Sequence, residues 1–148
     1  MVENQMVIHF DSRSSNEGFA RVVAGAFALQ MNPTLEELSD IKTAVSEAVT
    51  NAIIHGYPGR VARVEMQARI EGDVLEIVVK DRGVGIKDVE KAREPLFTTG
   101  DDTERSGMGF TMMETFMDEV EIESAVGRGT TVRMRKRLGG KRNVEAKR

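Results

Sequence analysis

Two polar side chains in residues 46–56 have the spacing of a pair that acts together on a helix. Glu47 and Asn51 are four residues apart, so a carboxylate and a carboxamide stand one above the other on the same helix face. Polar groups that border a core are costly to bury unless a partner occupies them. We expect that partner to be magnesium with a triphosphate, although such a pair taken alone is more often part of a solvated surface.

A glycine-bearing segment follows the most apolar strand that the sequence predicts. Residues 74–80 are nearly all apolar, which favours a strand in the centre of a sheet, and Asp81, Gly83 and Gly85 come directly after them. Glycines let the backbone approach a flat ligand closely, and a fixed carboxylate can accept a hydrogen bond from an exocyclic amine. In isolation the motif also fits a simple turn.

A second pair of glycines precedes another expected helix. We expect Ser106 to Phe110 to open this helix, with Gly107 and Gly109 placed where free N–H groups and the positive end of the helix dipole favour phosphate. The polar segment 94–107 before it is long enough to act as a lid. Gly-x-Gly alone is weak evidence for such a site.

Hydrophobic periodicity and turn signals divide the remaining chain into alternating helices and strands. We expect strands over 6–10, 61–70, 74–80, 120–126 and 130–136, and helices from Ser14 to about Gln30, from Thr34 to Gly56 and over 87–93. Both long helices begin with a predicted capping box, Ser14 with Glu17 and Thr34 with Glu37. The first helix should bury Phe19, Val22, Val23, Ala26 and Phe27, and the second a stripe that begins at Leu35.

Composition favours one soluble domain of residues 1–138, followed by a basic tail of residues 139–148 that we expect to be disordered. The 148 residues include no cysteine and two histidines, which argues against disulfides and zinc. The net charge of −3 argues against nonspecific binding to nucleic acid. We expect a cytoplasmic protein with no membrane contact, because no apolar run approaches the length of about 20 residues that spans a bilayer.

The motifs in this order resemble the nucleotide-binding domain shared by gyrase-type ATPases, heat-shock chaperones, mismatch-repair ATPases and histidine kinases. The resemblance implies an α/β two-layer sandwich with helices on one face of a mixed, mostly antiparallel sheet. Within that superfamily, the segments NAIIHGY at 51–57, EPLFTTG at 94–100 and ERSGMGFTMMETFMDEV at 104–120 resemble the anti-sigma factor serine kinases, most closely the sporulation anti-sigma-F factors. The chain departs from that pattern at 57–60 and 100–102, which puts loop contacts in doubt.

The resemblance implies a role for each matching residue. Asn51 would hold Mg²⁺, Asp81 would accept the adenine amine of ATP, and Glu47 would be the general base. Arg105 would reach the γ-phosphate. The remaining contacts would come from Gly83, Gly85 and Thr130 at the base and from Thr98, Thr99, Ser106, Gly107, Met108 and Gly109 along the phosphates.

A regulatory function in transcription is implied by the same resemblance. In that family a cytoplasmic homodimer with bound nucleotide keeps a sporulation sigma factor from RNA polymerase and phosphorylates an anti-anti-sigma protein on serine. Arg21 matches a position that contacts both partners.

Three other functions remain open on the residues themselves. The chain could be the catalytic domain of a histidine kinase, although no segment before Met6 supplies the expected helical phosphoacceptor. It could be an ATPase module in which Glu47 activates water. It could also be a binding module in which nucleotide is only structural.

Overall fold

The computed structural model describes the backbone of residues 2–94 and 103–139, and their side chains except those of residues 103–108. The elements, in chain order, are β1 (Asn4–Asp11), α1 (Ser15–Ala28), a 3-10 turn (Leu29–Met31), α2 (Leu35–Thr50), a π-helical segment (Asn51–Gly56), β2 (Arg63–Glu71), β3 (Val74–Asp81), α3 (Val89–Arg93), α4 (Thr103–Phe116), β4 (Glu119–Ala125) and β5 (Gly129–Arg137).

The strands form one sheet in the order β1-β2-β3-β5-β4, and all four pairings are antiparallel. The expectation that β3 is central is confirmed, and β1 lies at one edge. Two predicted hairpins are also confirmed: Glu71 pairs with Val74 around Gly72, whose φ is 60°, and Ala125 pairs with Gly129. The register places Asp81, at the end of β3, directly beside Thr130 of β5.

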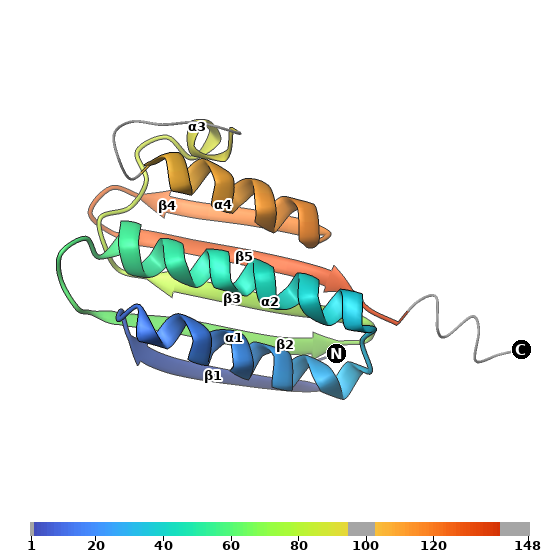
Figure 1. The fold of residues 1–148 in the computed structure, drawn as a ribbon. Helices are drawn as coiled ribbons and strands as arrows, with labels where there is room; N and C mark the ends of the chain where they lie inside the picture. The colour runs from blue at the N-terminus through green and yellow to red at the C-terminus, as the bar shows by residue number, and fades with distance from the viewer. Residues whose placement is uncertain (1, 95–102, 140–148) are drawn as a thin grey trace, which may run out of the picture.

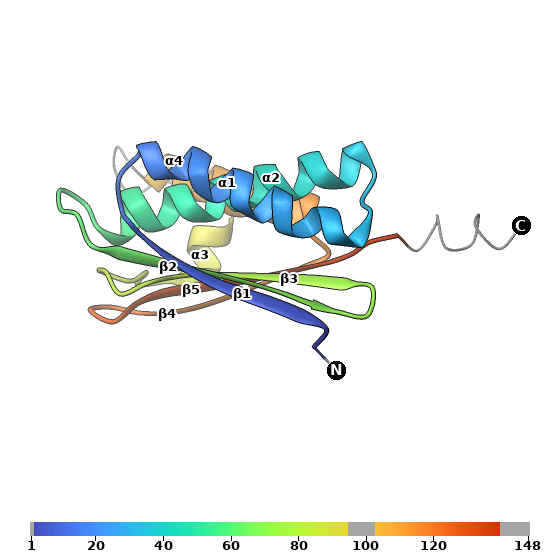
Figure 2. The ribbon, with the colours of Figure 1, turned by 90° about the horizontal axis from the view of Figure 1, so that it is seen from below.

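Helices α1, α2 and α4 cover a single face of this sheet, which confirms the predicted two-layer sandwich (Figures 1 and 2). Helix α2 lies over the middle of the sheet between the other two (Figure 1). Inward-facing side chains of the strands and helices form one core, whose largest fully buried members include Phe110, Ile41, Met66, Leu75 and Ile77.

The face that α1 buries differs from the predicted one. Its buried residues are Ala20, Ala24, Gly25 and Ala28, whereas Phe19 and Val22 are 52% and 61% exposed. Spacings of four residues place the small side chains on one face, where they allow α1 to lie close to α2 and the sheet. Val23 and Phe27 are partly buried against the core, as predicted, whereas the prediction was wrong for Phe19, Val22 and Ala26 because it ranked residues by hydrophobicity and ignored size.

The helix caps and first turns were predicted with mixed success. Thr34 and Glu37 form the expected capping box at α2, with both reciprocal hydrogen bonds present. The box expected at Ser14 is absent: Ser14 has helical dihedral angles and its side chain caps nothing. Leu35 was expected in the core, but it is the first residue of α2 and is 87% exposed.

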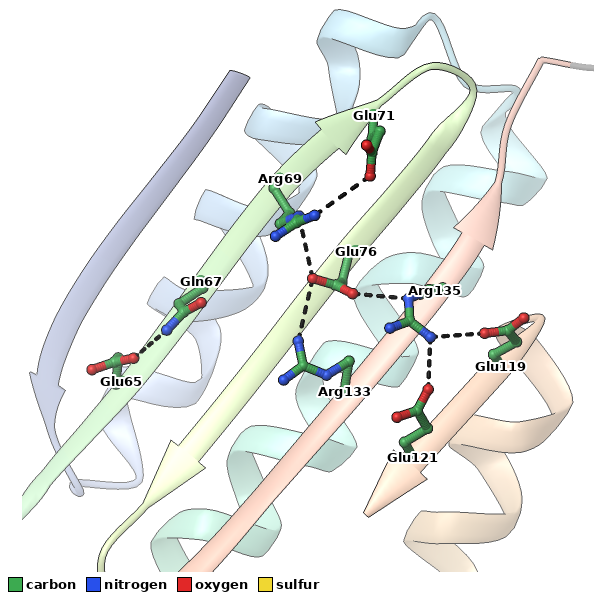
Figure 3. Close-up of polar contacts among 9 residues, drawn as sticks. All are labelled: Glu65, Gln67, Arg69, Glu71, Glu76, Glu119, Glu121, Arg133 and Arg135. Carbon is green, nitrogen blue, oxygen red and sulfur yellow. Dashed lines mark hydrogen bonds and ion pairs between the residues drawn. The ribbon is translucent and has the colours of Figure 1, made fainter. Parts of the chain in front are cut away.

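The face of the sheet away from the helices carries a network of ion pairs (Figure 3). Glu76 accepts contacts from three arginines on neighbouring strands, at 3.4 Å from Arg69, 3.4 Å from Arg133 and 2.8 Å from Arg135. Arg135 continues the network to Glu119 and Glu121 on β4. A buried carboxylate with several cationic partners is compatible with this position, because its charge is compensated from more than one side.

Among the residues that the structure describes, no helix is both long enough and apolar enough to span a membrane.

Candidate functional site

A cavity of about 680 Å³ lies between the layers, beneath the end of α2 and beside α4. The π-helical segment, the end of β3 with the loop after it, α3, α4 and β5 all contribute to its wall. Its polar and charged lining residues are Asn51, His55, Asp81, Lys87, Asp88, Lys91 and Thr130, and its apolar lining includes Val79, Ile86, Phe110 and Val132. The size and mixed lining suit a ligand with a flat apolar part and a charged part.

Asn51 supplies the clearest sign that the cavity takes a ligand. Its Nδ2 atom is buried and has no hydrogen-bond partner in the described part of the chain. An unpartnered buried amide costs about 1 to 3 kcal/mol, so a ligand that bonds to it gains that amount. Rotating the carboxamide by half a turn would present its oxygen at the same place, as a metal or a donor requires.

The backbone around Asn51 also departs from the predicted regular helix. Helix α2 keeps α geometry to Thr50, and residues Asn51–Gly56 then form π-type turns. Such segments are rare and often occur at functional sites. Here the segment places both Asn51 and His55 on the cavity wall.

Gly109 of α4 lies directly opposite Glu47 and Asn51. A Cβ atom on Gly109 would stand 3.3 Å from Oε2 of Glu47 and 3.5 Å from Nδ2 of Asn51. The carboxylate and the carboxamide therefore share one gap, which the missing side chain of Gly109 keeps open. Glu47 itself is not part of the cavity lining but stands at its border.

Asp81 ends β3 inside the cavity with its carboxylate held in place. Its Oδ1 accepts a hydrogen bond of 2.9 Å from the N–H of Gly83, and the side chain is buried. Burial raises the pKa of Asp81 above its ordinary value, an effect that backbone hydrogen bonds from Gly83 and Thr130 partly offset. A fixed, desolvated carboxylate of this kind can select a ligand that donates a hydrogen bond.

Glycines allow the loop after β3 to pack against its surroundings. A Cβ on Gly56 would lie 2.6 Å from Cγ of Asp81, and one on Gly83 would lie 1.7 Å from the carbonyl oxygen of Gly56. That carbonyl accepts a hydrogen bond from Val84 at 2.9 Å. Gly85 has φ of 77° and abuts the carbonyl of Ala125, so any side chain there would be both strained and crowded.

Thr130 of β5 lines the cavity, and its hydroxyl group is hydrogen-bonded to that of Ser124. Its Oγ1 is 2.8 Å from Oγ of Ser124, and the same Ser124 oxygen accepts a bond of 2.7 Å from the N–H of Ile86. This pair fixes the loop after β3 to the β4–β5 hairpin. Ser124 was not among the predicted site residues, because its hydroxyl looks like an ordinary strand position in sequence.

Four charged or titratable lining residues were also missed: His55, Lys87, Asp88 and Lys91. His55 follows Asn51 at the same four-residue spacing that linked Glu47 to Asn51, so that spacing could have found it. Lys87 and Lys91 are likewise four apart, within or just before α3. Together with Asp88, which lies between them in sequence, the two lysines leave this side of the cavity with a net positive charge.

Arg21 lies outside the cavity, on α1. Its Nη1 is 3.2 Å from Oε2 of Glu17 and 3.4 Å from Oγ of Ser46, and Ser46 in turn donates to Glu17. The carboxylate of Glu17, expected in a capping box, is therefore engaged between α1 and α2.

The predicted phosphate-side residues are only partly covered by the structure. Thr98 and Thr99 lie outside the described residues. Arg105, Ser106, Gly107 and Met108 lie within α4, whose first residue is Thr103, so the helix begins three residues before the predicted opening at Ser106. The side chains of these four residues are also outside the described part.

A magnesium ion fits this site in one particular mode. Among the described residues, no group of three or more His, Cys, Asp or Glu side chains forms a metal cage. Mg²⁺ commonly keeps several waters and takes one or two protein oxygens together with substrate phosphates. Asn51, buried beside the gap at Gly109, is suited to supply such an oxygen.

Comparisons with known proteins agree with this architecture. Residues 11–136 match the family model of the histidine kinase-like ATPase domain. A protein named anti-sigma F factor from Thermoanaerobacter sp. (strain X514) is 57% identical over 136 residues, which is 92% of this chain and 95% of the relative. Another of that name from Geobacillus kaustophilus is 55% identical over 140 residues, covering 93% and 94%.

Solved structures show the same fold at low sequence identity. The RsbU and RsbW domains of a Mycobacterium tuberculosis protein align with a TM-score of 0.66 and 22% identity, over 91% of this chain and 32% of that one. A histidine kinase domain from Erythrobacter litoralis aligns with a TM-score of 0.54 and 21% identity, over 88% and 64%. The chain therefore belongs to the histidine kinase-like ATPase family, and within it to the group of anti-sigma F factors.

Proposed function

We propose that the chain is an ATP- and Mg²⁺-dependent serine protein kinase that also acts as an anti-sigma factor. The observation that carries the proposal is the arrangement of Asn51, Asp81 and Thr130 on one cavity wall, with Glu47 at its border beside Gly109. The name of the relatives that span nearly the whole chain supports the sigma-factor part.

The base of ATP would lie at the Asp81 end of the cavity. The carboxylate of Asp81 accepts a hydrogen bond from the adenine amine, while Gly83 and Gly85 keep side chains away from the ring and Thr130 closes the site from β5. Guanine offers a carbonyl at that position, and two facing acceptors leave a buried polar group unpaired. ATP should therefore bind at least about tenfold more tightly than GTP.

The phosphates would extend toward Asn51 and Gly109. When bound, magnesium neutralises phosphate charge and orients the terminal phosphate. Asn51 would hold the ion through its side-chain oxygen. Lys87 and Lys91 line the cavity and add positive charge near the nucleotide. The remaining phosphate contacts follow the family resemblance and come from Thr98, Thr99, Arg105, Ser106, Gly107, Met108 and Gly109.

Glu47 would act as the general base for transfer to serine. Its carboxylate takes the proton from the serine hydroxyl while the serine oxygen forms a bond to the γ-phosphorus. The bond from that phosphorus to the β–γ bridging oxygen breaks at the same time, and ADP leaves with the bridging oxygen. The position of Glu47 across the gap from Gly109 supports this role, because the proposed phosphate path runs toward that gap.

The regulatory role would depend on two protein partners. The chain, as a homodimer with bound nucleotide, holds a sporulation sigma factor away from RNA polymerase. An anti-anti-sigma protein displaces the sigma factor until its own serine is phosphorylated. Arg21, which lies on α1 outside the cavity, contacts these partners.

Incubation with radiolabelled ATP, magnesium and an anti-anti-sigma protein tests this function. We expect acid-stable phosphoserine on the partner, lost in Glu47→Gln and strongly reduced in Asp81→Asn. Glu121→Gln is the matched control, because Glu121 lies on the far face of the sheet (Figure 3). A parallel binding assay with a sporulation sigma factor should show nucleotide-dependent affinity.

Each alternative function gives a different result in the same assay. Acid-labile label on the chain itself would support a histidine kinase. Free phosphate with no labelled protein would support an ATPase module. ATP binding without turnover would leave a nucleotide-dependent binding module, in which Glu47→Gln keeps full affinity for the sigma factor.

A further inference from the structure

A second hollow, of about 370 Å³, lies at the end of the sheet where β3 stops. Alternation along β3 puts its lining residue Lys80 on the face away from the helices, whereas the next residue, Asp81, faces the cavity at Asn51. We call this hollow the basic hollow, because four cationic side chains line it: Arg63 of β2, Lys80 of β3, Arg82 directly after β3, and Arg128 between β4 and β5.

The four cations of the basic hollow are not compensated within the protein. Among the residues that the structure describes, none of their side chains makes an ion pair or a hydrogen bond. Elsewhere on the same face the arginines are compensated: three of them share Glu76 (Figure 3), and Arg137 is 2.7 Å from Asp73. The positive charge of the basic hollow is therefore available to a ligand.

The two carboxylates that line the basic hollow are engaged by other groups. Glu65 accepts a hydrogen bond of 2.5 Å from Gln67, and its other oxygen is 3.9 Å from Nε2 of His9. Asp81 accepts its hydrogen bond from the N–H of Gly83. Four cations against two carboxylates leave the basic hollow positive, although the whole chain carries a net charge of −3.

The backbone beneath these cations is held in place. The hydroxyl of Tyr57, a buried residue, donates a bond of 2.8 Å to the carbonyl of Arg63 and accepts one of 2.6 Å from the N–H of Arg82. Gly129 brings the β4–β5 turn against the same segment, since a Cβ there would lie 2.6 Å from Cα of Arg82. The cations therefore project from a fixed frame, which lowers the cost of ordering them around a ligand.

The spacing of the cations indicates how many anionic groups the ligand carries. Lys80 and Arg82 are two positions apart, about 6.6 Å along an extended chain, and neighbouring strands lie about 4.8 Å apart. A single phosphate would leave part of this charge unpaired, whereas two or three linked phosphates can engage all of it.

Acidic residues on both sides limit the size of the ligand. Asp11 of β1 pairs in register with Arg63, and Glu123 of β4 pairs with Thr131, which lines the basic hollow. An extended polyanion such as nucleic acid would meet these carboxylates. The flanking charges therefore favour a compact ligand.

We propose that the basic hollow binds a compact ligand with two or more linked phosphate groups, at a site distinct from the cavity at Asn51. Arg63, Arg82 and Arg128 donate charge-assisted hydrogen bonds to the phosphate oxygens, and Lys80 contributes a further charge. The inference does not depend on the proposed kinase activity.

NMR titration of an isotope-labelled chain with inorganic pyrophosphate, in magnesium-free buffer, tests the site. The backbone amide signals of Lys80, Arg82 and Arg128 should shift together along one saturation curve. Shifts at Asn51 or Gly109 report the other cavity and are fitted separately. Inorganic phosphate should bind the basic hollow at least about tenfold more weakly than pyrophosphate, because it engages fewer of the cations.

Substitutions at the two outermost arginines measure their contribution. Arg82→Gln and Arg128→Gln should each weaken pyrophosphate binding about tenfold. Both side chains are exposed, so the variants should keep the fold, as unchanged signals from the core would verify. Arg137→Gln is the matched control, because it removes the same charge from the same face at the opposite end of β5, and it should change the affinity less than about twofold.

The inference is overturned if the signals of Lys80, Arg82 and Arg128 do not shift, or if Arg82→Gln and Arg128→Gln bind pyrophosphate as tightly as the unaltered chain does. An equal loss in Arg137→Gln would also overturn it, since the effect would then come from overall charge. If a short single-stranded oligonucleotide shifts the same signals at a lower phosphate concentration than pyrophosphate does, the ligand is a nucleic acid and the compact ligand is refuted.

Discussion

Replacing Gly109 by alanine should stabilise the fold and impair the site at once. Gly109 lies within α4, where glycine is about 1 kcal/mol less favourable than alanine. For a chain of this size, 1 kcal/mol corresponds to about 2 to 4 °C in melting temperature. The new Cβ meets no backbone, so we expect the chain without nucleotide to melt about 2 to 4 °C higher.

The same methyl group enters the gap between Glu47 and Asn51. At 3.3 Å from Oε2 of Glu47 it is closer than most real Cβ contacts, so the carboxylate must move, and the space intended for phosphate is reduced. Misplacement of reacting groups by about 1 Å can cost about a hundredfold in rate. We therefore expect phosphate transfer to fall by about that factor.

Thermal unfolding with and without ATP-Mg²⁺, combined with single-turnover transfer, measures both effects. Gly18→Ala in α1 is the control, because its Cβ meets only Nη2 of Arg21 at 3.7 Å and should give the stability gain alone. A Gly109→Ala chain with a raised melting temperature and full activity would refute the assignment of the gap. A lowered melting temperature would refute the packing described around Gly109.

Three further substitutions test the loop after β3 and the packing of α4. Because burial raises the pKa of Asp81, the folded chain keeps the carboxyl proton of Asp81 at pH values where the unfolded chain has already lost it. Without nucleotide, the free energy of unfolding should therefore fall as pH rises toward the folded-state pKa, whereas ATP affinity should fall as pH drops through that pKa. Asp81→Asn should remove both trends, as measured by urea and nucleotide titrations. Gly83→Ala should destabilise the chain by about 4 kcal/mol or more in urea unfolding, since its Cβ would lie 1.7 Å from the carbonyl oxygen of Gly56. Lys136→Met should cost about 2 kcal/mol in the same measurement, because Lys136 donates at 2.6 Å to a carbonyl at the end of α4 and lies 3.5 Å from Asp40.

Neighbouring positions supply controls for these three changes. Asp73→Asn, in the exposed β2–β3 hairpin, should leave the pH dependence of ATP affinity intact. Gly59→Ala has no atoms within 4 Å and should cost only about 1 to 2 kcal/mol for its φ of 73°. Arg137→Met removes an exposed ion pair and should cost less than about 1 kcal/mol. If a control substitution had the same effect as the substitution it is matched to, the contacts described here would be contradicted.

The elements of the fold could be predicted where one local signal dominates. The unbroken apolar run of β3 indicated its central place, Gly72 marked its hairpin, and Thr34 with Glu37 marked the start of α2. The buried face of α1 could not be predicted in this way. Small residues such as Ala24 give a weak hydrophobic signal, and their burial depends on how closely two helices approach.

The site could be predicted in part, because the positions of several of its residues are determined by their neighbours in sequence. Asp81 and the glycines that follow it predict a tight turn that holds a carboxylate in a fixed position. The role of Gly56 is different: its missing Cβ makes room for Asp81, which is 25 residues away, and no local pattern encodes that contact. Ser124 was missed for the same reason, since its partners Ile86 and Thr130 come together only in the folded sheet.

Without a bound ligand, several residues on the cavity wall are in energetically unfavourable states. Asn51 leaves an amide unpaired, Asp81 keeps a carboxyl group whose pKa is raised by burial, and Gly85 has a backbone conformation that few residues adopt. The charged network around Glu76 lies on the other face of the sheet, and the core residues that line the cavity, such as Phe110, are apolar, so neither shares these costs. A ligand that bonds to Asn51 and Asp81 removes two of the penalties when it binds. Nucleotide should therefore stabilise this chain by more than it stabilises Asp81→Asn, even at concentrations that saturate both.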